Sequence, residues 1–182
     1  MSTYTINVSF QTRVNKTTRT LEIAESFGLG LDEKDWTLYD NLELEVEQGD
    51  VVYITGQSGS GKSVVLRELQ RQMKDEGLSV ASIDDFTFDN DVNVIDQLGK
   101  TTSEALGLLS MAGLNDAYLF VRKPSEMSDG QKYRLKIAKL IESGAKVWAA
   151  DEFGAVLDRV TAQVVASNLQ RAARSEERRV GK

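Results

Sequence analysis

The 182-residue sequence contains no cysteine and no histidine. Without cysteine it has neither a disulfide framework nor thiolate chemistry, which fits a reducing compartment, and we expect a cytoplasmic protein. Without histidine the commonest general base and metal ligand is missing, so acid–base work must fall to carboxylates. No apolar run approaches the roughly 18 residues that a membrane-spanning helix needs, so direct membrane insertion is not expected.

Basic residues are fewer than acidic ones, and the formal net charge is -6. A surface that coats nucleic acid needs clustered Lys and Arg to neutralise phosphates, so nucleic acid is not indicated as a partner. The hydrophobic content of 41% is enough for the core of one domain.

Hydrophobic patterning predicts an antiparallel β portion at the N-terminus. Apolar residues alternate with polar ones around Ile6, Val8 and Phe10 and again from Leu42 to Val46, which is typical of half-buried strands. Between them we predict a short strand at Leu21–Ile23 and a loop at Phe27–Asp35.

The middle of the chain predicts a parallel β core. The elements expected here are a central strand at Val51–Thr55, a helix at Val64–Lys74 and a strand at Leu78–Ile83. This strand–helix–strand order makes a βαβ unit, whose two strands run parallel.

The pattern of the second half of the chain predicts several helices and one further strand. We predict a helix at Ser103–Met111 capped by Ser103, a helix at Asp129–Glu142, a strand at Lys146–Ala150 and a helix at Val160–Ala173. Residues 92–140 are interpreted as a small helical insertion in the βα core.

The last nine residues, Arg174–Lys182, resemble one reading frame of a common DNA-sequencing adapter. We therefore predict a non-native tail over 174–182, on a natural chain truncated near Ala173. The alternative is a solvated, charged helix end. On the first interpretation residues 1–173 form a single domain that is incomplete at its C-terminus.

A glycine-rich loop lies between the predicted strand at Val51–Thr55 and the helix after it. Its sequence fits the P-loop pattern G-x-x-x-x-G-K-[ST] in full: Gly56-Gln57-Ser58-Gly59-Ser60-Gly61-Lys62-Ser63. Glycines let successive backbone N–H groups point inward around phosphate oxygens, and the helix N-terminus adds its positive end. Lys62 would span the β- and γ-phosphates of ATP, and Ser63 would supply a hydroxyl to Mg²⁺. The alternative is a Gly/Ser-rich surface turn.

Asp151 and Glu152 follow the predicted strand Lys146–Ala150 directly. The carboxyl end of a parallel strand opens into the crevice where α/β sheets bind ligands. Asp151 is placed to hold Mg²⁺ through its water shell, and Glu152 is placed to polarise the attacking water as the catalytic base. The alternative is an acidic pair that ends a strand in solvent.

Residues Met127-Ser128-Asp129-Gly130-Gln131 open the helix that precedes this strand. Ser128 is a good N-cap, and Gly130 leaves room for a phosphate near the helix start. Taken alone, the segment is also explained as a well-capped helix.

The order of these segments resembles the nucleotide-binding domain of the ABC ATPase superfamily. Met127–Gln131 is similar to the family's LSGGQ signature, and Val156-Leu157-Asp158 to its D-loop, which contributes Asp158. The resemblance covers about Leu21 to Ala173. It implies an α/β P-loop NTPase of ABC type, with a parallel β core, an N-terminal antiparallel β portion and a small helical insertion.

The resemblance also implies partners. Two copies would sandwich two ATP molecules, with Gly56–Ser63 of one facing Ser128, Asp129, Gly130 and Gln131 of the other. Phe27 is the candidate for the aromatic residue that stacks on adenine. Tyr39 and Trp36 compete for that role, and each is also explained as a core residue.

The sequence departs from the family pattern in three places. Asp129 replaces the first glycine of the signature, and we expect it to point aside or to tune affinity. No Q-loop glutamine follows Leu78–Ile83, so Asp84 would take that Mg²⁺-proximal position, while Gln97 is expected at the surface. The family's switch histidine is missing, which truncation explains as readily as divergence.

The acidic loop around Asp84 to Asp91 lacks the glycine and glutamate of an EF-hand, so we expect it to be solvated.

These features favour an enzyme, a soluble ABC-type ATPase that uses Mg²⁺, works as a head-to-tail dimer and serves an unknown effector. It could belong to a longer protein, such as one fused to an acetyltransferase domain. The alternatives are the ATP-binding subunit of an ABC membrane transporter and a dimerisation module with vestigial hydrolysis. The stretch from Gly56 to Ser128 is short for a transporter subunit, and the order of motifs disfavours a P-loop kinase.

Overall fold

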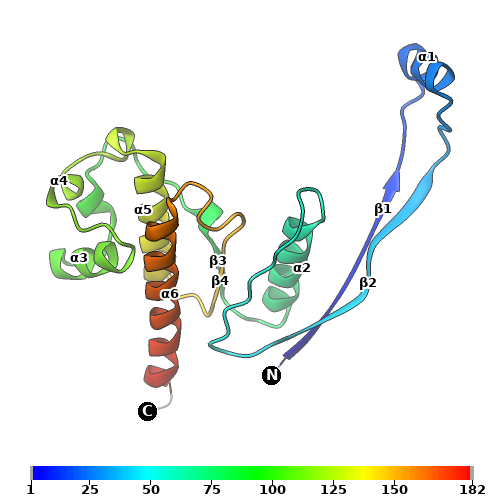
Figure 1. The fold of residues 1–182 in the computed structure, drawn as a ribbon. Helices are drawn as coiled ribbons and strands as arrows, with labels where there is room; N and C mark the ends of the chain where they lie inside the picture. The colour runs from blue at the N-terminus through cyan, green and yellow to red at the C-terminus, as the bar shows by residue number, and fades with distance from the viewer. Residues whose placement is uncertain (1, 181–182) are drawn as a thin grey trace. The chain divides into compact units, whose positions relative to one another are not determined.

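A computed structural model describes the backbone of residues 2–180 and the side chains of residues 2–172 apart from Lys34 (Figure 1). The chain divides into two compact units. The hairpin unit comprises Met1–Glu47 and Ile54–Leu69, and the helical unit comprises Gln48–Tyr53 and Gln70–Lys182. The predicted non-native tail, residues 174–182, lies outside the described side chains.

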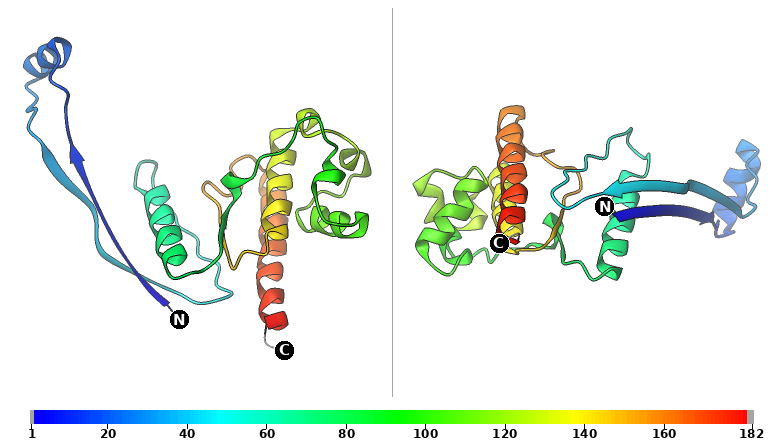
Figure 2. Two further views of the ribbon diagram at one scale, coloured as in Figure 1. Left: turned by 180° about the vertical axis from the view of Figure 1, so that it is seen from behind. Right: turned by 90° about the horizontal axis from the view of Figure 1, so that it is seen from below.

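Two long antiparallel strands form the hairpin unit, β1 (Ser2–Thr12) and β2 (Lys34–Val46). Ile6 lies opposite Leu42 in the register, and Tyr4 and Ile6 are buried. Figure 2 shows the two strands side by side in both of its views. The predicted antiparallel strands are therefore confirmed, with β2 beginning earlier than expected.

Helix α1 (Thr18–Phe27) forms the tip of the hairpin, between β1 and β2. A capping box starts it, because Thr17 Oγ1 accepts from Thr20 N at 3.3 Å and Thr20 Oγ1 accepts from Thr17 N at 2.8 Å. The predicted strand at Leu21–Ile23 is wrong, and so is the predicted start of a loop at Phe27. Two alternating apolar residues are a weak strand pattern, and a reciprocal cap that satisfies two backbone donors outweighs it.

The predicted central strand at Val51–Thr55 is also wrong, since these residues form no strand. A strand needs neighbours for its backbone N–H and C=O groups. Within residues 2–180 the sheets are the pairs β1–β2 and β3–β4, and neither includes this segment. Val51, Val52 and Tyr53 are exposed.

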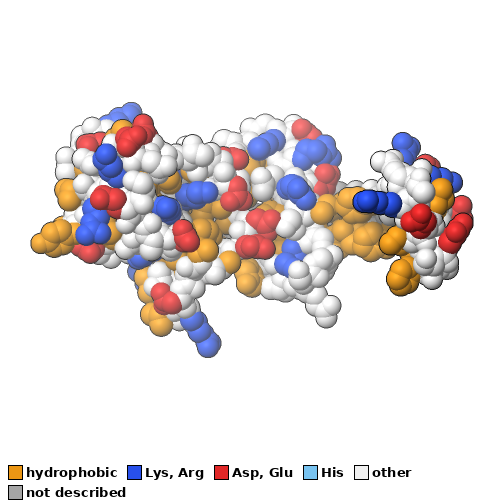
Figure 3. Space-filling view, turned by 90° about the horizontal axis from the view of Figure 1, so that it is seen from above, with side chains coloured by type: hydrophobic (Ala, Val, Ile, Leu, Met, Phe, Trp, Pro, Cys, Tyr) orange, Lys and Arg blue, Asp and Glu red, His pale blue; other side chains and the backbone are white. Residues whose placement is uncertain are grey.

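Hydrophobic side chains are also exposed along the hairpin unit (Figure 3). Phe10 and Trp36 lie opposite each other in the register, and their ring centroids are 6.4 Å apart. The other large exposed side chains of the hairpin and its tip are Val14, Leu21, Ile23, Phe27 and Leu29. Trp36 is therefore a surface residue of β2, not a core residue.

Helix α2 (Lys62–Asp75) follows the glycine loop and confirms the predicted helix. After it, β3 (Val80–Ser82) pairs in parallel with β4 (Val147–Ala149), and Ser82 lies opposite Ala149. Both strands lie within the predicted segments. The mixed α/β fold class is confirmed, with a two-stranded parallel sheet in the described residues.

The chain between β3 and β4 is mainly helical. Its elements are η1 (Ile83–Asp85), η2 (Val94–Gln97), α3 (Thr102–Met111), α4 (Ala117–Phe120), η3 (Pro124–Glu126) and α5 (Asp129–Glu142). The bounds of α5 match the prediction. Thr101, not Ser103, caps α3, since its hydroxyl accepts from Glu104 N at 3.2 Å and Ser103 already lies inside the helix. The assignment of residues 92–140 to an insertion, within one domain over 1–173, stays a prediction.

Helix α6 (Arg159–Val180) is 22 residues long and follows the turn after β4. It includes the predicted helix at Val160–Ala173. Among residues 2–180, no helix combines the length and apolar character needed to cross a membrane.

The core of the helical unit lies among α3, α5 and α6. Figure 2 shows α3 and α4 beside α5. The fully buried side chains include Leu109 from α3, Leu135 and Ile137 from α5, and Val165 from α6. These elements are held together by apolar burial, at about 25 cal/mol per Å² of apolar surface removed from water.

Truncating this core should destabilise the helical unit. Leu109→Ala removes a side chain that is 0% exposed and leaves a cavity, so we expect a loss of about 2–5 kcal/mol in the free energy of unfolding. Leu106→Ala, in the same helix but 38% exposed, is the control and should cost about 1 kcal/mol or less. Urea unfolding followed by circular dichroism measures both, and equal losses would contradict the assignment of the core.

Candidate functional site

The predicted site residues fall on both units. Phe27 and the glycine loop Gly56–Ser63 belong to the hairpin unit. The others belong to the helical unit, namely Asp84, Ser128, Asp129, Gly130, Gln131, Asp151, Glu152 and Asp158.

The glycine loop packs against strand β2. Gly61 has φ +85, which favours glycine, and a Cβ there would overlap Leu38 Cδ2 and come within 3.2 Å of Tyr39 Cε2. The Tyr39 hydroxyl donates to Ser60 O at 2.7 Å. Two residues of β2 therefore fix the loop's conformation. This role of Tyr39 was not predicted, because the sequence alone does not say which distant segment meets the loop.

Lys62 begins α2 and folds back over the loop. Its Nζ donates to Gly56 O at 3.0 Å and to Gln57 O at 2.8 Å. Ser63 is half-buried in the first turn of α2, where backbone N–H groups have no partners within the helix. The arrangement places an ammonium group, a hydroxyl and the positive end of a helix dipole at one loop, as an anion site requires.

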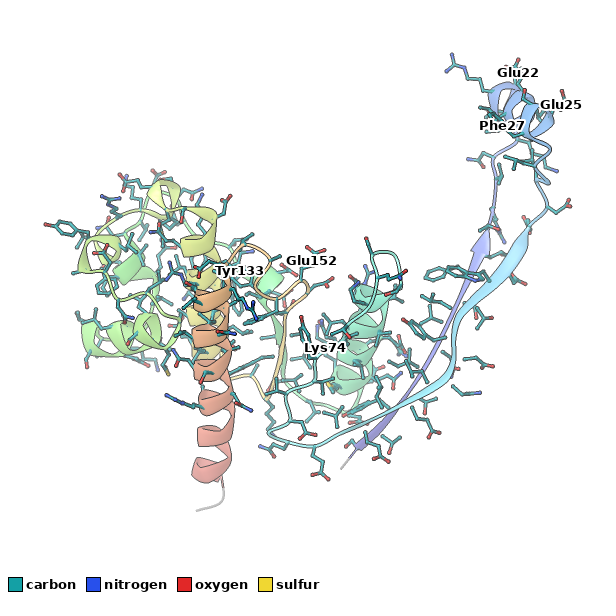
Figure 4. The ribbon with its side chains drawn as sticks, viewed as in Figure 1. Glu22, Glu25, Phe27, Lys74, Tyr133 and Glu152 are labelled. Atoms are coloured by element: carbon teal, nitrogen blue, oxygen red, sulfur yellow. The ribbon has the colours of Figure 1, made fainter. Side chains whose placement is uncertain are left out.

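Phe27, the predicted adenine-stacking residue, ends α1 at the tip of the hairpin and is 73% exposed. Figure 4 shows it there beside Glu22 and Glu25. It lies in a helix instead of the predicted loop. Its stacking role stays a prediction.

The acidic pair lies where β4 ends. Because β3 and β4 are parallel and in register at Ser82 and Ala149, Asp84 and Asp151 follow their strands at the same edge of the sheet. Asp151 is half-buried, and its Oδ1 accepts from Glu152 N at 3.0 Å. Glu152 is exposed and has φ +50, in the left-handed region that side-chain-bearing residues rarely adopt.

Tyr133 connects α5 to the turn that carries Glu152 (Figure 4). Gly154 N donates to its hydroxyl oxygen at 3.2 Å, and its ring meets Phe153 edge-on at 6.3 Å. Burial raises the pKa of the Tyr133 phenol, the Gly154 hydrogen bond opposes that shift, and the charge of Asp84 adds to it. Sequence reasoning missed Tyr133, although its spacing of three from Gly130 places both on one face of α5.

The predicted signature segment is a capped helix start. Ser128 Oγ accepts from Gln131 N at 3.3 Å, and Gln131 Oε1 accepts from Ser128 N at 2.9 Å, which confirms Ser128 as the N-cap. Asp129 is exposed in the first turn, where a carboxylate is favourable to the helix dipole. A Cβ at Gly130 would lie 3.2 Å from Val156 O, so this position permits a close approach of the turn after Glu152.

Asp158, the predicted D-loop residue, caps α6. Its Oδ1 accepts from Val160 N at 3.1 Å and from Thr161 N at 3.0 Å. Hydrogen bonds from the Thr161 side chain and backbone, and from Val160, lower the pKa of Asp158.

Gln97 is not the surface residue that was predicted. It is half-buried, with Oε1 accepting from Asp89 N at 2.9 Å and Nε2 donating to Asp89 O at 2.9 Å and Val92 O at 2.8 Å. It therefore braces the acidic loop instead of lying free. Among the side chains that the structure describes, no three acidic groups gather as a metal site.

Comparisons with known proteins show which family this chain is similar to. The family described as ABC transporter matches residues 39–155, which include the glycine loop, the signature segment and the acidic pair. The methionine import ATP-binding protein MetN 2 of Oceanobacillus iheyensis is 27% identical over 177 residues, covering 77% of this chain and 50% of that protein. The leukotoxin translocation ATP-binding protein LktB of Mannheimia haemolytica is 27% identical over 168 residues, covering 74% of this chain and 24% of that one.

The chain thus spans half the length, or less, of these curated relatives. Among solved structures, the dimeric ATP-binding cassette MJ0796 aligns with a TM-score of 0.66 and 17% identity, over 96% of this chain and 84% of that one, which shows a shared fold. The predicted fold and the predicted family are both confirmed. The chain belongs to the ABC transporter family and carries its ATPase domain.

Proposed function

We propose that this chain binds Mg-ATP at Gly56–Ser63 and hydrolyses it as one half of a head-to-tail pair of ABC domains. The observation that carries this is the glycine loop at the start of α2, with Lys62 held on the loop's own carbonyls. That loop lies inside the segment matched to the family.

Lys62 supplies the charge for phosphate binding. Its two carbonyl partners, Gly56 O and Gln57 O, are neutral acceptors, whereas phosphate oxygens carry negative charge and add direct Coulomb attraction to the hydrogen bond with the ammonium. The nucleotide would therefore take Lys62 from the loop, and the loop N–H groups and the start of α2 would hold the remaining phosphate oxygens.

The residues assigned to Mg²⁺ suit that ion. Ser63 offers a hydroxyl and Asp151 a carboxylate, both hard oxygen donors, and Mg²⁺ is usually held by one or two carboxylates together with phosphate oxygens and waters. Asp84 follows the carboxyl end of β3, as Asp151 follows the carboxyl end of the neighbouring β4. This common position favours a secondary role for Asp84 near the ion. Bound there, Mg²⁺ would neutralise charge on the β- and γ-phosphates.

Glu152 is the base that the proposal needs. The chain has no histidine, and the Glu152 side chain is exposed near the start of the turn after β4. A carboxylate there can accept a hydrogen bond from water and orient it for attack on the γ-phosphate.

A second copy would complete the site through Ser128–Gln131. The start of α5 is ordered by the Ser128–Gln131 capping box, and it carries the positive end of the helix dipole, which an anion would meet. The fold neighbour MJ0796 is dimeric, in one case bound to ADP and Pi. Asp129 lies exposed beside this helix start, where it would lower affinity for a phosphate through like-charge repulsion.

A second candidate function is the motor subunit of a membrane transporter. The names of the relatives MetN 2 and LktB favour it, since one protein serves methionine import and the other leukotoxin translocation. Against it, Asp84 and Asp85 stand where a Q-loop glutamine would follow β3. The alternative to a transporter subunit is a soluble ABC ATPase that works with an effector domain, such as an acetyltransferase. Co-purification with a multi-span membrane protein expressed from the same locus would favour the transporter.

Lys62→Ala should weaken ATP binding about 10- to 100-fold, because a charged hydrogen-bond donor is lost. Lys74→Ala, which removes the same charge from the last turn of the same helix, is the matched control and should leave the Kd unchanged (Figure 4). Isothermal titration with Mg-ATP measures both. If the two variants bind ATP equally well, the glycine loop is not the phosphate site.

Glu152→Gln should reduce the rate of ATP hydrolysis about 10²–10⁴-fold while ATP binding persists, since the amide cannot act as a base. The ATP-bound variant should also accumulate as a dimer in size-exclusion chromatography. Glu22→Gln, an exposed glutamate on α1, is the control for the lost charge (Figure 4). Unchanged phosphate release by Glu152→Gln would refute the assigned base.

A further inference from the structure

The turn that carries Glu152 is strained and needs support. Glu152 has φ +50, a conformation that persists in a non-glycine residue only where its surroundings hold it. Three hydrogen bonds act within the turn, from Glu152 N to Asp151 Oδ1 at 3.0 Å, from Ala155 N to Glu152 O at 3.0 Å and from Leu157 N to Gly154 O at 2.9 Å. All three are local, so none of them ties the turn to the rest of the helical unit.

The Tyr133 side chain supplies a tie to α5. Its hydroxyl accepts the Gly154 N–H, two residues after Glu152, and its ring packs edge-on against Phe153, one residue after Glu152. The raised pKa of Tyr133 keeps the phenol neutral near pH 7, so the contact is an ordinary hydrogen bond. Gly130, on the same face of α5, lets Val156 O approach closely.

α5 is a firm support for this contact. Leu135, Ile137 and Ala138 are fully buried in the core of the helical unit, so the helix cannot shift without losing apolar burial. Tyr133 therefore projects from a fixed element onto a turn that has no regular secondary structure of its own.

We propose that Tyr133 is a positioning residue for hydrolysis, which holds the turn in the conformation that directs the Glu152 carboxylate. The inference rests on the proposed function of Glu152. Tyr133 makes no contact with ATP in this scheme; it acts through Gly154 and Phe153.

The test compares Tyr133→Phe with wild type and with Tyr118→Phe in the full chain. Tyr133→Phe keeps the ring and removes the acceptor oxygen of the Gly154 hydrogen bond. Tyr118 is 76% exposed in the same unit, so Tyr118→Phe removes the same atom without that contact. We expect Tyr133→Phe to lower kcat for ATP about tenfold with KM within about twofold, and Tyr118→Phe to change neither.

Two further readouts separate positioning from a general loss of structure. In the Glu152→Gln background, Tyr133→Phe should cause no additional loss of kcat, because both substitutions act through one group. Hydrogen exchange should quicken about tenfold at residues 152–157 in Tyr133→Phe, with exchange in α5 unchanged. This readout does not require turnover.

The outcomes distinguish the two proposals. If Tyr133→Phe leaves kcat and exchange at 152–157 as in wild type, or if its effect adds fully to that of Glu152→Gln, the positioning role is overturned. If instead the turn loosens in Tyr133→Phe while Glu152→Gln hydrolyses ATP normally, the structural contact is real and the proposed role of Glu152 is wrong. That result overturns the role in hydrolysis as well.

Discussion

The buried face of α5 is the constraint on which the helical unit depends. Leu135, Ile137 and Ala138 lose almost all contact with water in the core, and this burial fixes both the position and the rotation of the helix. Once the rotation is fixed, the helix start at Ser128 and the Tyr133 side chain have fixed directions as well. The direction of the helix start and the contact of Tyr133 with the acidic turn therefore both depend on this packing, while the Ser128 cap itself is a local feature.

In the hairpin unit a different constraint shapes the glycine loop, namely that no side chain fits at Gly61. The close approach of Leu38 and Tyr39 from β2 leaves no room for a Cβ at that position, and the Tyr39 hydroxyl holds Ser60 O beside it. The loop is thus shaped by contact with a strand and not only by its own flexibility. Lys62, bound to two loop carbonyls, closes the same loop from within.

Sequence patterns predicted the elements that carry their own local evidence. α5 has a cap, a reciprocal Gln131 and helical periodicity, and its bounds were predicted to the residue. The strand at Val51–Thr55 was predicted from apolar character alone, which says nothing about whether neighbouring strands exist to pair with it. α1 does not follow from the two alternating apolar residues Leu21 and Ile23, because the feature that starts it is the Thr17–Thr20 capping box. The motif residues of the candidate site were predicted from their pattern and spacing, whereas the contacts of Tyr39 and Tyr133 depend on which distant segments meet.

The geometry of α5 also bears on why an ABC domain would need its signature segment to respond to nucleotide. Gly130 and Tyr133 lie on one face of the helix, and both contact the turn between Glu152 and Val156. The same first turn of the helix holds Ser128 and Gln131, the residues proposed to meet a phosphate on a second copy. In the proposed scheme, a ligand at this helix start would therefore meet α5 one turn away from the Tyr133 contact that supports the turn carrying Glu152. Under the proposed function, the segment that would meet a phosphate and the support of the turn that carries Glu152 would therefore both belong to α5 of one chain.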